Sequence, residues 1–294
     1  MNPVRVGLVG AGPWAGMFHA PMLAAGPETT LAVVYARRIE AARELAERFG
    51  THATDDFDEF LGRCDAVAFA VPPDVQARLA PLAAAAGKPL LLEKPLALSV
   101  TAAQQMVDAI DQAGVPTQLM LTLRYTARIR QFLDQARQFD AFGARAAWIS
   151  GAFLPGSPFS TPWRLEYGAL LDVGPHVLDL LDAALGPIRS TSVLGDPHTW
   201  VAVTAVHEGG AVSDVAVSSV VPGFVWECSL FGPAGELHAP QAGEDETAEV
   251  QPVIAAEFAQ VVRSGRSHEL DAHRGLFLQR LLRHAAPPNG ARAQ

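Results

Sequence analysis

Short apolar runs alternate with segments of helical periodicity along the first 120 residues. The runs that predict strands lie at residues 4–9, 31–35, 66–71, 89–92 and 117–123. The segments that predict helices lie at residues 40–49, 74–86 and 99–114, and a further helix follows the first strand. Strands that are apolar throughout are typical of a parallel sheet covered by helices on both faces. Right-handed crossovers then predict a doubly wound α/β domain.

The pattern changes after residue 124, where apolar and polar positions begin to alternate. Alternation predicts strands at residues 144–153, 201–207, 212–220 and 225–231. Helical periodicity occurs at residues 129–139, 169–185, 253–263 and 273–284. Strands without intervening helices favour an open, mainly antiparallel sheet. We therefore expect an α/β domain at residues 1–120, an α+β domain at 121–286 and a flexible tail at 287–294.

Length, charge and cysteine content limit the kinds of binding partner and the cellular environment that we expect. At roughly 150 residues per domain, 294 residues fit two domains. The net charge of −9 repels phosphate backbones, so we expect no nucleic-acid partner. We expect no membrane span, since the chain has no long uncharged apolar run. We also expect no signal peptide, since no charged segment with an apolar stretch and a cleavage site precedes the first predicted strand. Only Cys64 and Cys228 are present, too few for a disulfide framework, so we expect two small buried side chains in a cytoplasmic protein.

A glycine loop follows the first predicted strand. Its residues match the dinucleotide fingerprint G-x-G-x-x-A and are Gly10, Ala11, Gly12, Pro13, Trp14 and Ala15. The first glycine of this motif permits a tight turn, and the second lets the backbone approach a pyrophosphate. The small last residue lets the following helix pack close to the sheet, with its N-terminus facing the phosphates. We expect a dinucleotide site here rather than a plain turn.

The end of the second predicted strand bears on the choice of cofactor. An acidic residue at this point would bind the ribose diol of NAD, but the sequence reads Tyr35, Ala36, Arg37 and Arg38. A guanidinium group can bind a 2′-phosphate through two parallel hydrogen bonds. We therefore expect NADP as the cofactor, with NAD as the alternative. In the other interpretation, Arg37 and Arg38 are solvated loop charges.

Glu93, Lys94 and Pro95 end another predicted strand. Adjacent Glu and Lys residues usually form solvated ion pairs of little energetic value. The carboxyl ends of parallel strands, however, are where such sheets hold ligands. Lys94 is therefore a candidate to direct its ammonium group at a substrate oxygen.

Asp172 and His176 form a candidate acid–base pair. Either one helix, kinked at Pro175, places them on the same face, or a helix begins after Gly174 with Pro175 in its first turn. Both geometries keep the carboxylate close to the imidazole, which suits proton transfer near neutral pH. A lone helical histidine is more often a core or capping residue. We expect no metal site, because one Asp–His pair lacks a third ligand.

Together these features resemble the Gfo/Idh/MocA family of NAD(P)-dependent oxidoreductases over nearly the whole chain. Besides the glycine loop, the resemblance rests on Val71-Pro72-Pro73, Ala86-Gly87-Lys88, Glu93-Lys94-Pro95, Arg124-Tyr125, Trp163-Arg164, Asp172-x-Gly174-x-His176 and Arg274-Gly275. It implies a Rossmann domain followed by a substrate-binding domain on an open, mainly antiparallel sheet. It also implies a homodimer or homotetramer formed through that sheet.

The resemblance further implies the roles of individual residues. Lys94 would lie near the nicotinamide and the substrate hydroxyl, His176 would be the general base, and Asp172 its partner. The other implied cofactor-binding residues are Ala36, Val71, Pro72, Pro73, Gln76 and Glu93, and the implied substrate-binding residues are Arg124, Trp163, Arg164 and Tyr167. The expected reaction transfers a hydride between nicotinamide and a polyol, sugar or related hydroxy or keto compound.

Two departures from the family pattern affect specificity. Gln76 stands where many members carry histidine, and Glu166-Tyr167-Gly168 replaces a glycine triplet, so Tyr167 adds bulk near the substrate. Two other functions are considered: a catalytically silent dinucleotide-sensing regulator, and a hydrolytic member that uses NAD transiently. We favour the redox enzyme because Lys94, Asp172 and His176 are all present.

Overall fold

The chain divides into two compact units. The computed structural model describes residues 2–241 and 246–282, so the expected tail at 287–294 lies outside the described residues. The first unit comprises Met1–Leu121 and Asp245–Phe277, and the second comprises Thr122–Glu244 and Leu278–Gln294. The chain leaves the first unit beside the predicted boundary at residue 120. The observed division differs from the predicted one because the segment Asp245–Phe277 also belongs to the first unit.

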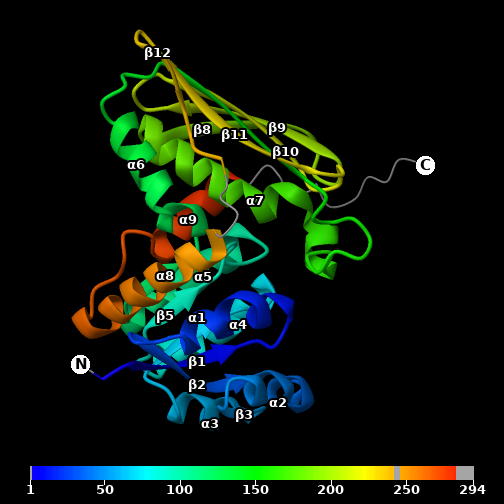
Figure 1. Cartoon of the computed structure of the whole chain (residues 1–294), viewed down its shortest axis with the longest axis vertical. Helices are drawn as coiled ribbons and strands as arrows, with labels where there is room; N and C mark the ends of the chain where they lie inside the picture. The colour runs from blue at the N-terminus through cyan, green and yellow to red at the C-terminus, as the bar shows by residue number, and fades with distance from the viewer. Residues whose placement is uncertain (1, 242–245, 283–294) are drawn as a thin grey trace. The chain divides into compact units, whose positions relative to one another are not determined.

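A six-stranded parallel sheet forms the centre of the first unit (Figure 1). Its strands are β1 (Val4–Val9), β2 (Thr29–Tyr35), β3 (His52–Thr54), β4 (Ala66–Phe69), β5 (Leu90–Leu92) and β6 (Thr117–Leu119). Their order, β3-β2-β1-β4-β5-β6, reverses direction between β1 and β4, as in a doubly wound fold. All residues of β4 and β5 are buried, which explains their uninterrupted apolar sequence. The predicted parallel sheet is confirmed.

The helices of the first unit are η1 (Ala15–His19), α1 (Ala20–Ala24), α2 (Ile39–Arg48), α3 (Phe57–Gly62), α4 (Pro73–Ala85), α5 (Val100–Ala113) and α8 (Glu246–Ser264). Helix α9 (Ala272–Leu281) begins in this unit and ends in the second. The predicted ends of α5 are confirmed, because Ser99 caps its first turn and Gly114 closes it at a φ of +67°. Hydrogen bonds join the segment after residue 246 to the strands of this unit. Leu119 N–H donates to Leu270 O (2.7 Å), and Gln118 Nε2 donates to Ile254 O (3.3 Å).

A second, six-stranded mixed sheet forms the other unit. Its strands are β7 (Gly143–Ser150), β8 (Ile188–Asp196), β9 (Trp200–His207), β10 (Val212–Ser218), β11 (Phe224–Gly232) and β12 (Gly235–His238). The order is β12-β11-β7-β10-β9-β8, and only β7 and β10 pair in parallel. The predicted open, mainly antiparallel sheet is therefore confirmed. The sequence did not predict β8 or β12, two edge strands whose residues are mostly exposed.

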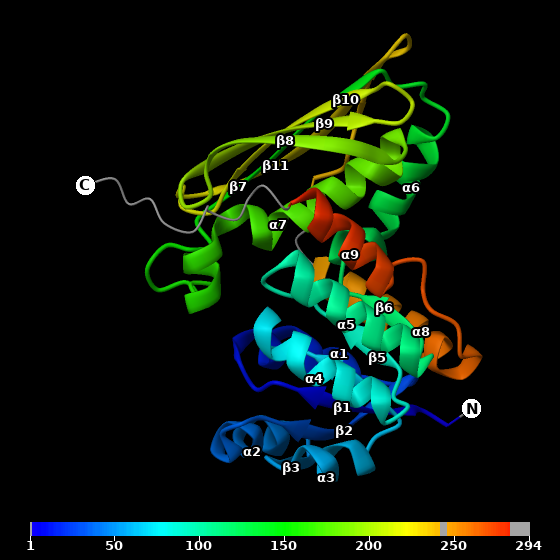
Figure 2. The same cartoon turned by 180° about the vertical axis from the view of Figure 1, so that it is seen from behind.

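Helix α7 (Pro162–Leu185) packs against β7, β9 and β10 on one face of the second sheet (Figure 2). The remaining helices of this unit are η2 (Thr122–Tyr125) and α6 (Ala127–Ala136). Along β9, the buried residues Val201, Val203 and Ala205 alternate with exposed ones, so the sheet buries one face only. Within the described residues, no helix is long and apolar enough to cross a membrane.

Candidate functional site

The glycine loop leaves the carboxyl end of β1 and enters a helical turn at Ala15. Gly10 has a φ of +123°, and a Cβ there would stand 2.3 Å from Ala70 O, so no larger residue fits. At Gly12, by contrast, a Cβ would meet no heavy atom within 4 Å. Open space in front of this peptide is what a pyrophosphate requires, so the loop fits a dinucleotide.

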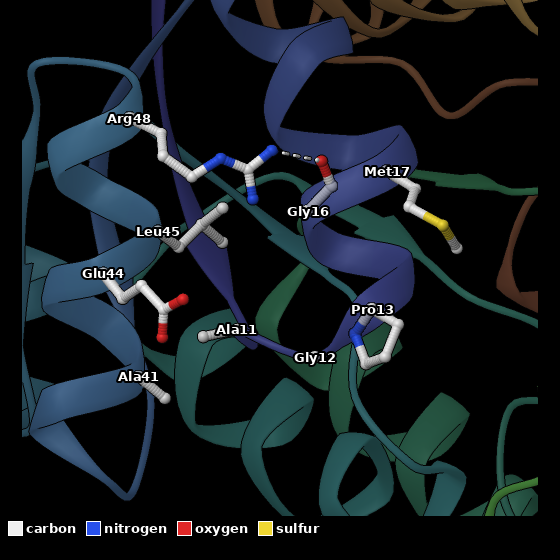
Figure 3. A pocket seen from close by; sticks show the side chains of 9 residues that line it. All are labelled: Ala11, Gly12, Pro13, Gly16, Met17, Ala41, Glu44, Leu45 and Arg48. Carbon is white, nitrogen blue, oxygen red and sulfur yellow. Dashed lines mark hydrogen bonds between the residues drawn. The ribbon is translucent and has the colours of Figure 1, made fainter. Parts of the chain in front are cut away.

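A pocket of about 320 Å³ opens beside this loop (Figure 3). It is lined by Ala11, Gly12, Pro13, Gly16, Met17, Ala41, Glu44, Leu45 and Arg48. The two charged side chains of the pocket, Glu44 and Arg48, come from helix α2. Arg48 Nη2 donates a hydrogen bond to Gly16 O at 3.3 Å. The glycine loop therefore borders a cavity within the first unit, in keeping with the dinucleotide site predicted there.

Arg37 and Arg38 follow β2 and are both exposed. Within the described residues, neither guanidinium group has an ion-pair partner. Ala36 occupies the position where a carboxylate would bind a ribose diol, and its N–H donates to Thr54 O. Both cations thus remain available to an anionic ligand.

A buried carboxylate connects the glycine loop to the end of β5. Glu93 Oε1 accepts hydrogen bonds from Trp14 Nε1 and His19 Nε2, each at 2.7 Å. Its second oxygen, Oε2, accepts from the N–H of Lys94 at 3.2 Å. His19 is fully buried, and its Nε2 acts as the donor because it faces a carboxylate oxygen, which can only accept. Glu93 therefore holds two side chains from the start of the first helix beside the backbone of Lys94.

Gln76 fixes the strand end from the other side. Its Oε1 accepts from Glu93 N–H at 2.8 Å, and its Nε2 donates to Glu93 O (2.8 Å) and Leu96 O (3.1 Å). The side chain is fully buried, and the structure shows its amide used within the protein. The cofactor contacts expected of Gln76, Val71, Pro72 and Pro73 stay predictions.

In the second unit, Asp172 and His176 lie in one helix, as the first of the two predicted alternatives has it. The backbone leaves the helical region at Gly168 and not at Pro175, and the sequence did not predict this break. Gly168 has a φ of +79°, and a Cβ there would stand 2.2 Å from Pro197 O. The helix is therefore divided into residues 162–167 and 169–185 at a position where any residue other than glycine is strained.

Asp172, His176 and Asp179 occupy one face of α7, because they are separated by four and three residues. All three are buried: 6% of Asp172, 6% of His176 and none of Asp179 is exposed. The His176 ring stacks on Trp148 of β7, with centroids 5.8 Å apart and planes 20° apart. The helix thus provides spacing for the acid–base pair, and the sheet sets the plane of the imidazole.

Each carboxylate on this face has an arginine beside it. Arg164 Nε lies 3.0 Å from Asp172 Oδ2, and Arg124 Nη1 donates to Asp179 Oδ2 at 3.0 Å. Pairing offsets the cost of burying these charges. Both arginines were predicted to bind substrate, and that role stays a prediction. Sequence reasoning missed Asp179, although an acidic residue between apolar neighbours, seven positions after Asp172, was a usable signal.

The predicted catalytic residues lie in different units, Lys94 in the first and Asp172 with His176 in the second. Of the remaining predicted substrate residues, Trp163 stacks on Arg164, and Tyr167 is half-buried. Within residues 2–241 and 246–282, no group of three or more His, Cys, Asp or Glu side chains could hold a metal ion.

Comparison with known proteins identifies the family. Residues 4–121 match the family model described as "Oxidoreductase family, NAD-binding Rossmann fold". The chain is also 30% identical over 231 residues to dTDP-3,4-didehydro-2,6-dideoxy-alpha-D-glucose 3-reductase of Streptomyces violaceoruber, an alignment that covers 70% of this chain and 67% of that protein. The chain belongs to the Gfo/Idh/MocA oxidoreductase family. The predicted resemblance is thereby confirmed.

Other relatives in this family also act on sugars, according to their names. Levoglucosan dehydrogenase of Pseudarthrobacter phenanthrenivorans is 28% identical over 231 residues, covering 72% of this chain and 58% of that enzyme. UDP-N-acetylglucosamine 3-dehydrogenase of Acidithiobacillus ferrooxidans is 28% identical over 227 residues, covering 75% and 69%. The chain thus aligns with between 58% and 69% of the length of these three relatives.

Solved structures of Gfo/Idh/MocA dehydrogenases show the same fold over a longer range. GenD2 from gentamicin A biosynthesis, solved with NAD, superposes with a TM-score of 0.85 at 24% identity and covers 97% of this chain and 93% of that one. The scyllo-inositol dehydrogenase of Lactobacillus casei has a TM-score of 0.83 at 18% identity, covering 97% and 96%. At these identities the likeness shows the fold alone.

Proposed function

We propose that this family member transfers a hydride between a nicotinamide cofactor and a CH–OH group of a polyol, sugar or related hydroxy or keto compound. The observation that carries this proposal is the buried face of α7, where Asp172 and His176 are one turn apart. A carboxylate and an imidazole at this spacing suit proton transfer near neutral pH. The three named relatives, which are sugar dehydrogenases or a reductase, support the substrate class.

The family resemblance implies a separate role in the reaction for each of three residues of this chain. In the oxidative direction His176 removes the proton of the substrate hydroxyl, and Asp172 fixes the orientation of the imidazole. Lys94 provides the positive charge that stabilises the oxygen left behind. The nicotinamide cofactor, when bound, accepts or donates the hydride. Gly10, Ala11, Gly12, Pro13 and Trp14 would hold its pyrophosphate.

We further propose NADP rather than NAD as the cofactor. Arg37 and Arg38 are exposed cations after β2, and Ala36 offers no carboxylate to a ribose diol. A 2′-phosphate would receive charge-assisted hydrogen bonds from such guanidinium groups. The match to an NAD-binding family model and the NAD complex of GenD2 support the dinucleotide, and the two arginines support the phosphorylated form.

Turnover assays test the proposal. The purified chain is incubated with NADP or NAD and a panel of polyols and sugars, while reduced nicotinamide is followed by absorbance. Lys94→Ala and His176→Ala are expected to abolish turnover while cofactor still binds. Full activity in both variants would refute the proposal. A regulator that only senses the dinucleotide would bind cofactor without turnover. A hydrolytic enzyme would consume substrate without net reduction of NADP.

We also propose that the chain forms a homodimer or homotetramer through the outer face of the second sheet. On that face Leu194, Ala202, Ala216 and Ala147 are aligned across four neighbouring strands. Leu194 is 74% exposed, and nearby Trp200 is 45% exposed. An exposed leucine aligned with three alanines on one face of a sheet can pack against a second sheet. Light scattering that gives a monomer mass would refute this assembly. The cytoplasmic location stays a prediction.

A further inference from the structure

We propose that Arg164 is a positioning residue that acts through Asp172, and that its guanidinium group does not bind the substrate. The inference rests on the proposed function, because it takes Asp172 and His176 as the acid–base pair. It replaces the substrate contact that the family resemblance implies for Arg164 with an indirect role in the same reaction.

The Arg164 guanidinium group lies beside a carboxylate, a hydroxyl group and two aromatic rings of its own chain. Nε lies 3.0 Å from Asp172 Oδ2, and Nη1 donates to Thr161 Oγ1 at 3.2 Å. The group also lies over the ring of Trp163, 4.5 Å from its centroid, and 5.7 Å from the centroid of Phe159. The Nε–H does not point along the line to Oδ2, so the contact is an ion pair rather than a directed hydrogen bond.

Burial strengthens this ion pair. Only 14% of the Arg164 side chain and 8% of the Asp172 side chain are exposed. Two aromatic rings beside the guanidinium exclude water and add a cation–π attraction. Attraction between opposite charges is stronger where the effective dielectric constant is low. The pair therefore differs from a surface salt bridge, which contributes little.

The break at Gly168 makes the contact possible. Arg164 and Asp172 are eight residues apart, which in an unbroken α-helix separates them by roughly 12 Å along the axis. Helical side chains also lean towards the N-terminus, so Arg164 would lean away from Asp172. The positive φ of Gly168 turns the segment at residues 162–167 out of line with the rest of α7 and lets the guanidinium return to the carboxylate.

The turn between β8 and β9 holds this break in place. Ala169 N–H donates to Pro197 O at 3.0 Å, just after the break. His198 Nε2 donates to Glu166 O at 3.1 Å, just before it. Both contacts fix the orientation of the short segment that carries Arg164. The position of this cation beside Asp172 is therefore set by the fold.

The consequence for the reaction follows from the order of residues on α7. A cation beside Asp172 favours the ionised carboxylate, which accepts hydrogen bonds and does not compete as a donor. Asp172 stands one turn before His176 on the same buried face. Loss of Arg164 is therefore expected to reduce proton transfer by His176 while leaving substrate affinity largely intact.

A double-mutant cycle on the cofactor-loaded enzyme tests this. Arg164→Met, Asp172→Asn and the double variant are compared by kcat and KM. We expect Arg164→Met to lower kcat by about tenfold or more with little change in KM, and to add almost nothing in the Asp172→Asn background. Arg164→Lys, which restores a cation, is expected to recover part of kcat. Arg137→Gln, which removes an exposed ion pair with Asp134, is the matched control and should change neither constant.

The outcomes separate this inference from the proposed function. If Asp172→Asn leaves kcat unchanged, the acid–base assignment itself fails. If Asp172→Asn lowers kcat but the effects of the two single variants multiply, Arg164 acts independently of Asp172 and the inference is overturned. An effect of Arg164→Met on KM alone overturns it as well, since that indicates direct substrate binding. Should Arg164→Met not fold, the same cycle is run with Arg164→Gln, which also removes the positive charge.

Discussion

Arg164 Nε and Asp172 Oδ2 lie 3.0 Å apart on opposite sides of the break that Gly168 makes in α7. The pair joins two parts of one helix that a regular backbone would hold apart. A short segment at residues 162–167 thereby supplies the counter-charge to a carboxylate on the buried face. The local backbone at a single glycine thus decides which cation Asp172 has beside it.

Gly168→Ala is expected to destabilise the protein by about 2–4 kcal/mol, because a Cβ meets the Pro197 carbonyl and the φ of +79° strains any L-residue. Gly186→Ala is the matched control. Its backbone is similar, with φ 88° and ψ 174°, but its Cβ would meet no heavy atom within 4 Å. Urea unfolding should show the larger loss for Gly168→Ala. Equal losses would show that contact with Pro197 does not matter.

Removal of the two cations after β2 should distinguish the cofactors. Arg37→Ala and Arg38→Ala are each expected to weaken NADPH binding by about tenfold and to leave NADH binding almost unchanged, because only NADPH carries the 2′-phosphate. Fluorescence titration of both cofactors measures this. Arg43→Ala removes an exposed arginine of α2 and serves as the control for the change in net charge. An equal loss for both cofactors would contradict the assignment of NADP.

Trp14→Phe removes the indole N–H that donates to Glu93 but keeps an aromatic ring to stack on Phe18, whose centroid is 4.6 Å away. We expect a loss of about 1.5–3 kcal/mol in the free energy of unfolding, the usual value for a hydrogen bond to a charged group. Cofactor binding should weaken as well, since the glycine loop loses its attachment to the end of β5. Calorimetry and fluorescence titration measure the two effects.

Trp226→Phe provides the comparison for that experiment. It also removes an indole hydrogen bond, from Nε1 to Pro240 O at 3.2 Å, but in the second unit. It should lower stability without changing cofactor affinity. The role given to Trp14 would be refuted if both variants, or neither, weakened cofactor binding.

The two cysteines predict how stability depends on alkaline pH. Both are buried, as the sequence predicted, and burial raises the pKa of Cys228 from 9.0 to about 12 and also raises the pKa of Cys64. The folded state therefore keeps the thiol proton that the unfolded state loses, so the free energy of unfolding falls as pH rises from about 9 to 12. For one group the slope is about 1.4 kcal/mol per pH unit. Urea unfolding at several pH values should show a shallower decline in Cys228→Ala, and identical slopes would contradict this.

Features that depend on short-range pattern could be predicted from the amino-acid sequence. Apolar runs in β4 and β5 predicted a parallel sheet, because strands buried on both faces need no polar positions. The glycine loop followed from the residue types that a tight strand-to-helix turn allows. The four-residue spacing of Asp172 and His176 made a shared helix face one of two predicted alternatives, because residues four apart lie on one face of a helix.

Contacts between groups far apart in the chain could not be predicted in this way, because they depend on tertiary packing. Trp14 and Glu93 are 79 residues apart, and no local pattern connects an indole at the start of one helix to a carboxylate after another strand. The break at Gly168 depends on the Pro197 carbonyl in a later hairpin. The edge strands β8 and β12 escaped prediction because exposed edges carry no apolar pattern. Hydrophobic periodicity indicates which face of each segment is exposed to solvent. The partner of a buried charge is instead determined by packing between segments far apart in the chain.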